Sequence, residues 1–151
     1  MSNAERAQEA LREIFTGDHS QLADYYAPDF QDHVNRMEFR GIESIPVSTA
    51  LPRNLCLDLS VEFDRQIAEG DLVTTYWTLR GTYRGRALRF AGVSTHRFQG
   101  ERIVECWDVA DSIDTFRQLG VWLSTLMLLT QWRAMLSLRR AEKALPVDSI
   151  R

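Results

Sequence analysis

The part of the sequence that most restricts the fold lies between residues 55 and 111, where four runs typical of β-strands follow one another. In the first run, Leu55 to Asp64, apolar residues alternate with polar ones, which predicts a long strand with one buried face. The later runs are rich in β-branched and aromatic residues and span Leu72 to Arg84, Leu88 to Phe98 and Ile103 to Asp111. Short turns that contain glycine separate these runs. Because short turns join antiparallel neighbours, the sequence predicts a four-stranded antiparallel meander.

Helical patterns flank the predicted sheet on both sides, at residues 3–15, 21–26, 41–51 and 121–138. Pro28 would end the second of these helices, and Pro46 would shorten or displace the third. Asp29 to Arg40 shows no clean period, so we expect this segment to be irregular or briefly extended. Gln131 and Arg133 interrupt the apolar last segment too early for a membrane span, which needs roughly 20 apolar residues.

Helices that precede a curved antiparallel sheet predict an α+β fold in which the helices cover one face of the sheet. The chain has 151 residues, 44% of them hydrophobic and 26% charged, which suits one globular domain with its own core. We expect a single domain over residues 1–151, with a core near 4–120 and a helical extension at 121–145. A strongly bent sheet closed by helices leaves a hollow on its concave side, where a small ligand would bind.

Composition and cysteine usage argue against several classes of protein. The net charge of -3 provides no basic surface of the kind that nucleic acid requires. Cys56 and Cys106 lack the spacing of a zinc site or a disulfide framework, so we expect a reducing, cytoplasmic setting. The N-terminus has no apolar run after a basic start, and no signal peptide is expected.

The last predicted strand contains the leading candidate for a catalytic residue. Alternation puts Cys106 and Asp108 on one face of this strand and Trp107 on the other. If the face of Asp108 lines the hollow, desolvation would raise its pKa toward a range where the carboxyl can both take and give a proton. His96, on the neighbouring strand, could orient that carboxyl, donate to a substrate oxygen or act as a second acid or base. Both residues could instead be purely structural, and the sequence leaves these alternatives open.

Six further residues are candidates for ligand contacts: Phe30, His33, Asn35, Trp77, Ser94 and Cys106. His33 and Asn35 lie in the segment expected to be irregular, where site residues are common, although such residues also form ordinary turns. Phe30 and Trp77 could provide flat apolar walls or belong simply to the core. Ser94 shares a strand face with His96, and Cys106 shares one with Asp108, although a buried cysteine in a strand is usually unreactive. The aspartates at 24, 29 and 32, with His33, match no metal-ligand spacing, so no metal is expected.

Several sequence pieces, taken together, resemble the SnoaL-like polyketide cyclase family within the nuclear transport factor 2-like superfamily. The pieces are YYAPDFQDHV at Tyr25 to Val34, GIE at Gly41 to Glu43, AEGDLVTTYWTLRGTYRG at Ala68 to Gly85, RIVECWDVAD at Arg102 to Asp111 and QLG at Gln118 to Gly120. They span most of Ala4 to Gly120. Three departures stand out: a short turn at Gly85-Arg86 where the family has a longer excursion, Cys106 where it often has histidine, and the apolar segment after Gly120.

The resemblance implies a cone-shaped α+β fold, with a curved antiparallel sheet and N-terminal helices packed on its concave face. It also implies an enzyme without cofactor or metal that closes a ring by intramolecular aldol condensation of a polyketide-like carbonyl compound. The acid/base group would be the aspartate of the Trp-Asp pair, which is Asp108 here. The ligand would be a small hydrophobic or polycyclic carbonyl compound.

Other functions stay open at this point. The same pocket could serve an isomerase or a hydroxylation-related enzyme, since fold alone does not determine the reaction. The chain could also be a non-catalytic module that binds a small ligand or forms oligomers. The apolar segment at 121–138 would need burial, so we expect a homo-oligomer, most simply a dimer, or a segment that closes the cone itself.

Overall fold

The computed structural model describes residues 1–35, 37–111 and 113–120, together with Thr125, Leu129 and Trp132. The chain divides into two compact units, Met1–Thr115 and Phe116–Arg151, and the first unit contains the sheet and the helices that lie before and between its strands. Residues 113–120 and the three later described positions are helical. The rest of the helix predicted at 121–138 lies outside the described residues.

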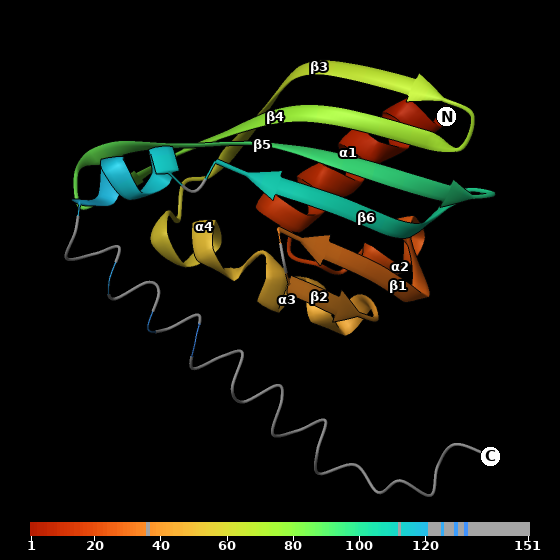
Figure 1. The fold of residues 1–151 in the computed structure, drawn as a ribbon, viewed down its shortest axis with the longest axis horizontal. Coiled ribbons are helices and arrows are strands. Elements are labelled where there is room, and N and C mark those ends of the chain that lie inside the picture. The colour runs from red at the N-terminus through yellow and green to blue at the C-terminus, as the bar shows by residue number, and fades with distance from the viewer. Residues whose placement is uncertain (36, 112, 121–124, 126–128, 130–131, 133–151) are drawn as a thin grey trace, which may run out of the picture. The chain divides into compact units, whose positions relative to one another are not determined.

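A six-stranded, curved sheet forms the body of the first unit (Figure 1). Its strands are β1 (Tyr26–Val34), β2 (Met37–Arg40), β3 (Ser60–Glu69), β4 (Leu72–Tyr83), β5 (Arg86–Gln99) and β6 (Arg102–Ala110), in the spatial order β2-β1-β6-β5-β4-β3. The run from β3 to β6 is an antiparallel meander, as the sequence predicts. β1 joins it by pairing parallel to β6, and β2 pairs antiparallel to β1 at the edge of the sheet.

The N-terminal helix α1 (Asn3–Thr16) begins at a capping box, in which the Ser2 hydroxyl accepts from the Glu5 backbone and the Glu5 carboxylate accepts from the Ser2 backbone. Its apolar residues are buried at helical spacing, and α1 contacts β3 and β4. The ring of Phe15 lies 5.0 Å from that of Trp77 on β4. The helix therefore covers the sheet face on which Trp77 lies, in agreement with the predicted α+β class.

Short helices connect α1 to the sheet and β2 to β3. They are α2 (Leu22–Tyr25), the 3₁₀-helix η1 (Ile42–Ser44), α3 (Ile45–Ser48) and α4 (Ala50–Leu55). Pro46 lies in the first turn of α3, where its missing N–H costs nothing, so the proline displaces the helix predicted at 41–51 rather than preventing it. Among the described residues, no helix combines the length and the apolar character that a membrane crossing needs.

Two local predictions differ from the structure. The segment Asp29 to Arg40, expected to be irregular or briefly extended, is mostly extended: it forms most of β1 and all of β2, and Pro28 lies inside β1 instead of ending a helix. This strand is bonded to a neighbour on each side, so tertiary pairing supports an extended chain that lacks clean alternation.

The first predicted strand also begins too early. Residues up to Leu55 belong to α4, and β3 starts only at Ser60 and runs on to Glu69. Leu57, expected to face the core, is exposed, while its neighbour Cys56 is buried. The alternation over these first residues therefore does not reflect a strand.

Candidate functional site

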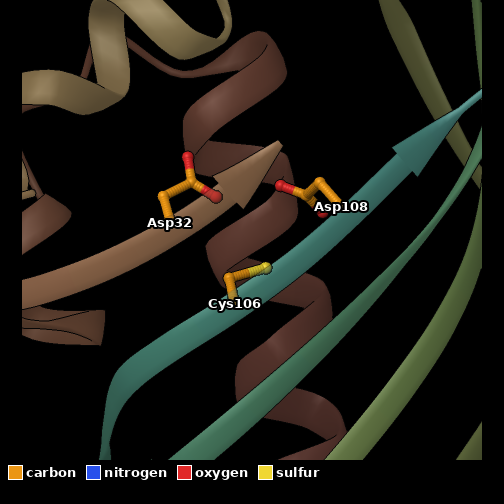
Figure 2. Close-up of side chains that lie close together, drawn as sticks. All are labelled: Asp32, Cys106 and Asp108. Carbon is orange, nitrogen blue, oxygen red and sulfur yellow. The ribbon is translucent and has the colours of Figure 1, made fainter. Parts of the chain in front are cut away.

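Three chemically active side chains meet where β1 lies against β6. Figure 2 shows Asp32 of β1 and Asp108 of β6 directed toward one another, with Cys106 beside them. The parallel register pairs Asp32 with Cys106 and Val34 with Asp108, so the three side chains share one face of the sheet. One ligand atom of each residue, two carboxylate oxygens and a sulfur, lies within 4.8 Å of the others.

A chain of hydrogen bonds fixes the Asp108 carboxylate from the neighbouring strands. The antiparallel register places Ser94 of β5 opposite Asp108 and Trp77 of β4 opposite Gly92. The indole Nε1 of Trp77 donates to Ser94 Oγ over 2.8 Å, and the Ser94 hydroxyl donates to Asp108 Oδ1. Because Ser94 is fully buried, its hydroxyl is held in this role and orients the carboxylate.

Burial makes negative charge costly at this site. Asp108 is half-buried, and desolvation raises its pKa, while hydrogen bonds from Ser94, Cys106 and Asp32 act in the opposite direction. Desolvation and then the charge of Asp108 raise the pKa of Asp32 to about 7. Desolvation and the two carboxylates also raise the pKa of the Cys106 thiol and of the buried Tyr26 hydroxyl well above their usual values.

Because the pKa values of Asp32, Cys106 and Asp108 are all raised, protons stay bound in this site at higher pH than is usual for such groups. Cys106 stays a thiol, which does not favour a role as nucleophile. The two carboxyls are the groups able to exchange a proton. A metal ion bound by Asp32, Cys106 and Asp108 would have a mixed oxygen and sulfur donor set, and it would have to displace the thiol proton.

Sequence reasoning missed Asp32 as a site residue because it expected 29–40 to be irregular or only briefly extended, and so assigned its side chains to no face of the sheet. A strand assignment for 26–34 would have placed Phe30 and Asp32 on one face and His33 on the other. The position of Asp32 next to Asp108 nevertheless needs the pairing of β1 with β6, which no local pattern reveals.

His96 lies on the same face, opposite Cys106 in the register of β5 and β6. Its side chain is fully buried, and neither ring nitrogen has a hydrogen-bond partner among the described residues. Desolvation lowers the pKa of His96 to about 4, so the ring is neutral at neutral pH. A neutral ring offers one donor and one acceptor, and no positive charge to balance the carboxylates.

The structure does not bring His33 to Asp108. His33 Nε2 lies 3.0 Å from Glu105 Oε1, and its ring stacks on that of Trp107 at 5.6 Å between centroids. Arg97 donates to the same glutamate, with Nη2 at 2.5 Å from Oε2. These residues occupy the opposite face of the sheet from Asp108, as strand alternation requires.

Asn35 has a positional role at the end of β1. It adopts a left-handed conformation with φ of 53°, which asparagine tolerates better than most residues. Its backbone N–H donates to the backbone carbonyl of Asp108 over 2.8 Å, while Asn35 itself is exposed. Asn35 therefore helps to join the end of β1 to β6.

The predicted aromatic walls, Phe30 and Trp77, are buried. Phe30 packs edge-on against Tyr26 with 4.7 Å between ring centroids, and Trp77 contacts Phe15. Phe30 precedes Asp32 by two residues on the same strand, and Trp77 reaches Asp108 through Ser94.

The chain is similar to several proteins of known structure. Wild-type IdmH from Streptomyces antibioticus, a candidate polyketide cyclase, matches with 22% identity over 80% of this chain and 100% of its own, with a TM-score of 0.71. A candidate polyketide cyclase from Bacillus cereus matches with 21% identity over 78% of this chain and 80% of its own, also with a TM-score of 0.71.

A third similar structure is AclR from Streptomyces galilaeus, a candidate hydroxylase, with 23% identity over 79% of this chain and 87% of its own, and a TM-score of 0.66. At these identities the likeness concerns the fold. No curated protein matches the chain in sequence. The family model of the SnoaL-like polyketide cyclases matches residues 5–119, which include every element from α1 to β6 except the first residues of α1. The chain therefore belongs to the SnoaL-like polyketide cyclase family.

Proposed function

We propose that this protein is a small-molecule enzyme that closes a ring in a polyketide-like carbonyl compound by intramolecular aldol condensation, with Asp108 as general acid and base. The observation that carries the proposal is the half-buried Asp108 carboxyl, oriented by Ser94 and with a raised pKa. A carboxyl with a pKa nearer to neutral than usual is better matched to taking a proton from carbon and giving it back. Membership of a family of polyketide cyclases supports the same chemistry.

The proposed reaction uses one proton twice. The Asp108 carboxylate removes a proton from a carbon α to a carbonyl, and the resulting enolate attacks a second carbonyl of the same molecule. A carbon–carbon bond forms and the attacked oxygen becomes an alkoxide. Asp108, now protonated, returns the proton to that alkoxide, so the enzyme ends as it began. Holding both ends of the ligand together supplies the proximity on which ring closure depends.

Other residues have supporting roles in this proposal. Ser94 orients the carboxylate, and burial keeps the pKa of Asp108 raised although the hydrogen bond from Cys106 acts to lower it. The buried Phe30 and Trp77 would provide apolar walls for the ligand. His96 is the second candidate for a polar contact, as a neutral donor or acceptor without a partner among the described residues. We assign no role in the reaction to His33 or Asn35. His33 contacts Glu105 on the other face of the sheet, and Asn35 contacts Asp108 only through its backbone.

Asp108→Asn tests the proposal directly. With a panel of synthetic β-keto esters that carry a second ketone, turnover should fall by about 10²-fold or more, because the amide cannot transfer the proton. Ligand binding measured by calorimetry should stay within about threefold, since the amide keeps the size and the bond to Ser94. Asp71→Asn, an exposed carboxyl in the turn before β4, is the matched control and should leave turnover unchanged.

Turnover by Asp108→Asn at the rate of the natural chain would contradict the acid/base role. Dialysis against a chelator should leave turnover unchanged, because the proposed steps use no metal.

The mass of the product distinguishes the alternative reactions. Aldol closure or isomerisation keeps the substrate mass or loses one water, whereas the hydroxylation suggested by the likeness to AclR adds one oxygen. Ligand binding without any turnover of the panel would favour a binding module of the same fold.

A further inference from the structure

We propose that Asp32 is a positioning residue for Asp108: the two carboxyls share a single proton, which Asp32 holds while Asp108 carries the negative charge. This inference rests on the proposed function of Asp108 as the proton-transfer group. It adds Asp32 to the site as a second acid and states which of the two carboxyls is protonated.

The first argument is the proximity of two acids in a site with no compensating cation. Carboxylate oxygens of Asp32 and Asp108 lie within 4.8 Å of each other, and Asp32 is only 4% exposed. Among the described residues, neither carboxyl forms an ion pair with an arginine, lysine or histidine. Two like charges this close in a poorly hydrated site repel strongly, so one proton is retained by the pair.

The second argument is an asymmetry in hydrogen bonding. Asp108 Oδ1 accepts from the Ser94 hydroxyl, whose own oxygen accepts from the Trp77 indole, so a donor is already aimed at this carboxylate. Asp32 Oδ1 is buried and has no hydrogen-bond partner among the described residues. Donors stabilise the charged form of a carboxyl, and their lack favours the protonated form. The negative charge therefore belongs on Asp108 and the proton on Asp32.

The groups that face Asp32 support this assignment. Asp108 and Cys106 face it from β6, and Tyr26 lies on its own strand. The Ser48 hydroxyl of α3 is the one polar group that lowers the pKa of Asp32, and it does not outweigh burial and the charge of Asp108, which raise that pKa to about 7. Cys106 and Tyr26 keep their protons, since their pKa values are raised as well. His96 on β5 is neutral.

The shared proton has a mechanistic use. A proton on Asp32 lets Asp108 stay ionised inside a buried site, and so keeps it ready as a base below the pH at which Asp32 ionises. Above that pH the pair carries two negative charges, and a ligand that develops enolate character beside it is repelled. Asp32 thus tunes Asp108 without touching the reacting carbon.

Carbon-13 NMR of the aspartate carboxyls in the full chain tests the pairing without any substrate. In the natural protein, one carboxyl should titrate near pH 7, and its signal should be absent in Asp32→Asn. In Asp108→Asn, the titration of Asp32 should move down by at least one pH unit, a tenfold loss in proton affinity, because the neighbouring charge is gone. Asp29→Asn removes an exposed carboxyl from the same strand and should leave that titration unchanged.

Ser94→Ala provides a second test that keeps both acids. Loss of the Ser94 hydroxyl should raise the pH at which Asp108 first ionises, because the hydrogen bond that stabilises the charged carboxylate is gone. The proposal is overturned if both carboxyls titrate below pH 5 in the natural protein, or if Asp32 titrates at the same pH with and without the Asp108 charge. Backbone amide spectra of each variant confirm that the fold is intact before its titration is compared.

The pH profile of turnover separates this inference from the proposed function. With a turned-over substrate, kcat/KM of the natural protein should fall above about pH 7, and Asp32→Asn should lack this decline while it stays active near pH 6. A merely structural role of Asp32 would lower activity at every pH alike. If Asp108→Asn remains active while the NMR titration of the natural protein shows a carboxyl that titrates near pH 7, the acid/base role of Asp108 is contradicted. The proposal that Asp32 and Asp108 share a proton is then still supported.

Discussion

At the scale of single residues, His96 and Asp32 make opposite contributions to the pH dependence of stability. The pKa of His96 is lowered in the folded protein to about 4, so the unfolded chain binds more protons as the pH falls below about 6.5. This contribution destabilises the fold toward acid. The pKa of Asp32 is raised to about 7, so its contribution favours the fold at low pH and is lost as the pH rises toward 7. Between about pH 4 and pH 7 the two contributions to the pH dependence of stability have opposite signs. A variant that removes only one of the two groups is therefore needed to measure either contribution.

His96→Leu should therefore stabilise the protein increasingly as the pH falls. Relative to the natural chain, the gain between pH 7 and pH 4.5 should grow by roughly 1–3 kcal/mol, because leucine has no buried ring to protonate. Urea unfolding at a series of pH values measures the difference. Above pH 7 the imidazole is neutral in both states, so the difference should be flat there and serves as the internal control. A difference that is flat over the whole range would contradict a lowered pKa for His96.

At the scale of elements, the contact between β4 and β5 depends on a glycine. Gly92 faces Trp77 in the register, and a Cβ at Gly92 would lie 2.4 Å from Cζ2 of that indole and 2.9 Å from the Val109 carbonyl oxygen. Only a residue without a side chain leaves room for the ring. The same ring donates the hydrogen bond that fixes Ser94, and through it Asp108. Packing between these strands thus controls the geometry of the site.

Gly92→Ala should destabilise the protein by about 1–3 kcal/mol, the usual cost of overpacking. The displaced indole should also lose its bond to Ser94, with a change in tryptophan fluorescence. Trp77→Phe lacks the clashing ring atoms, so the double variant should be more stable than the sum of the two single effects implies. Strict additivity in this cycle, measured by urea unfolding, would show that Gly92 and Trp77 are not coupled.

The elements also show how far sequence patterns reach. The strands β4, β5 and β6 carry strong β-type patterns bounded by glycine turns, and both their existence and their pairing were predictable from sequence. α1 was predictable from its helical spacing. β1 and β2 were not, because their extended conformation depends on partners that are distant in the chain. Residues 55–59 show the converse: they alternate as a strand does but mostly finish α4 and a turn.

At the scale of the whole molecule, the family match ends at residue 119, and the apolar segment from Val121 onward follows it. We propose that this segment forms the contact between two copies of the chain, because so many apolar side chains need burial. Residues 1–120 include every strand that the structure describes, and the carboxyl pair. The site should therefore persist without the segment.

A chain shortened to residues 1–120 should keep its circular dichroism spectrum and elute as a monomer in size-exclusion chromatography, while the full chain elutes as a dimer. The Asp32 titration near pH 7 should be unchanged. If the shortened chain remains a dimer, the contact lies within residues 1–120. If it aggregates or loses its spectrum, the segment completes the core instead of joining two copies.

The sequence by itself determined the meander of β4, β5 and β6, and the face on which Asp108, Cys106, Ser94 and His96 lie. Alternation along a strand and short glycine turns are local properties, so they can be recognised without a structure. The tertiary structure alone decided that β1 lies parallel to β6, and with it that Asp32 meets Asp108 and that His33 points to the other face. Parallel pairing joins segments far apart in the chain, and its register depends on packing that no local pattern encodes.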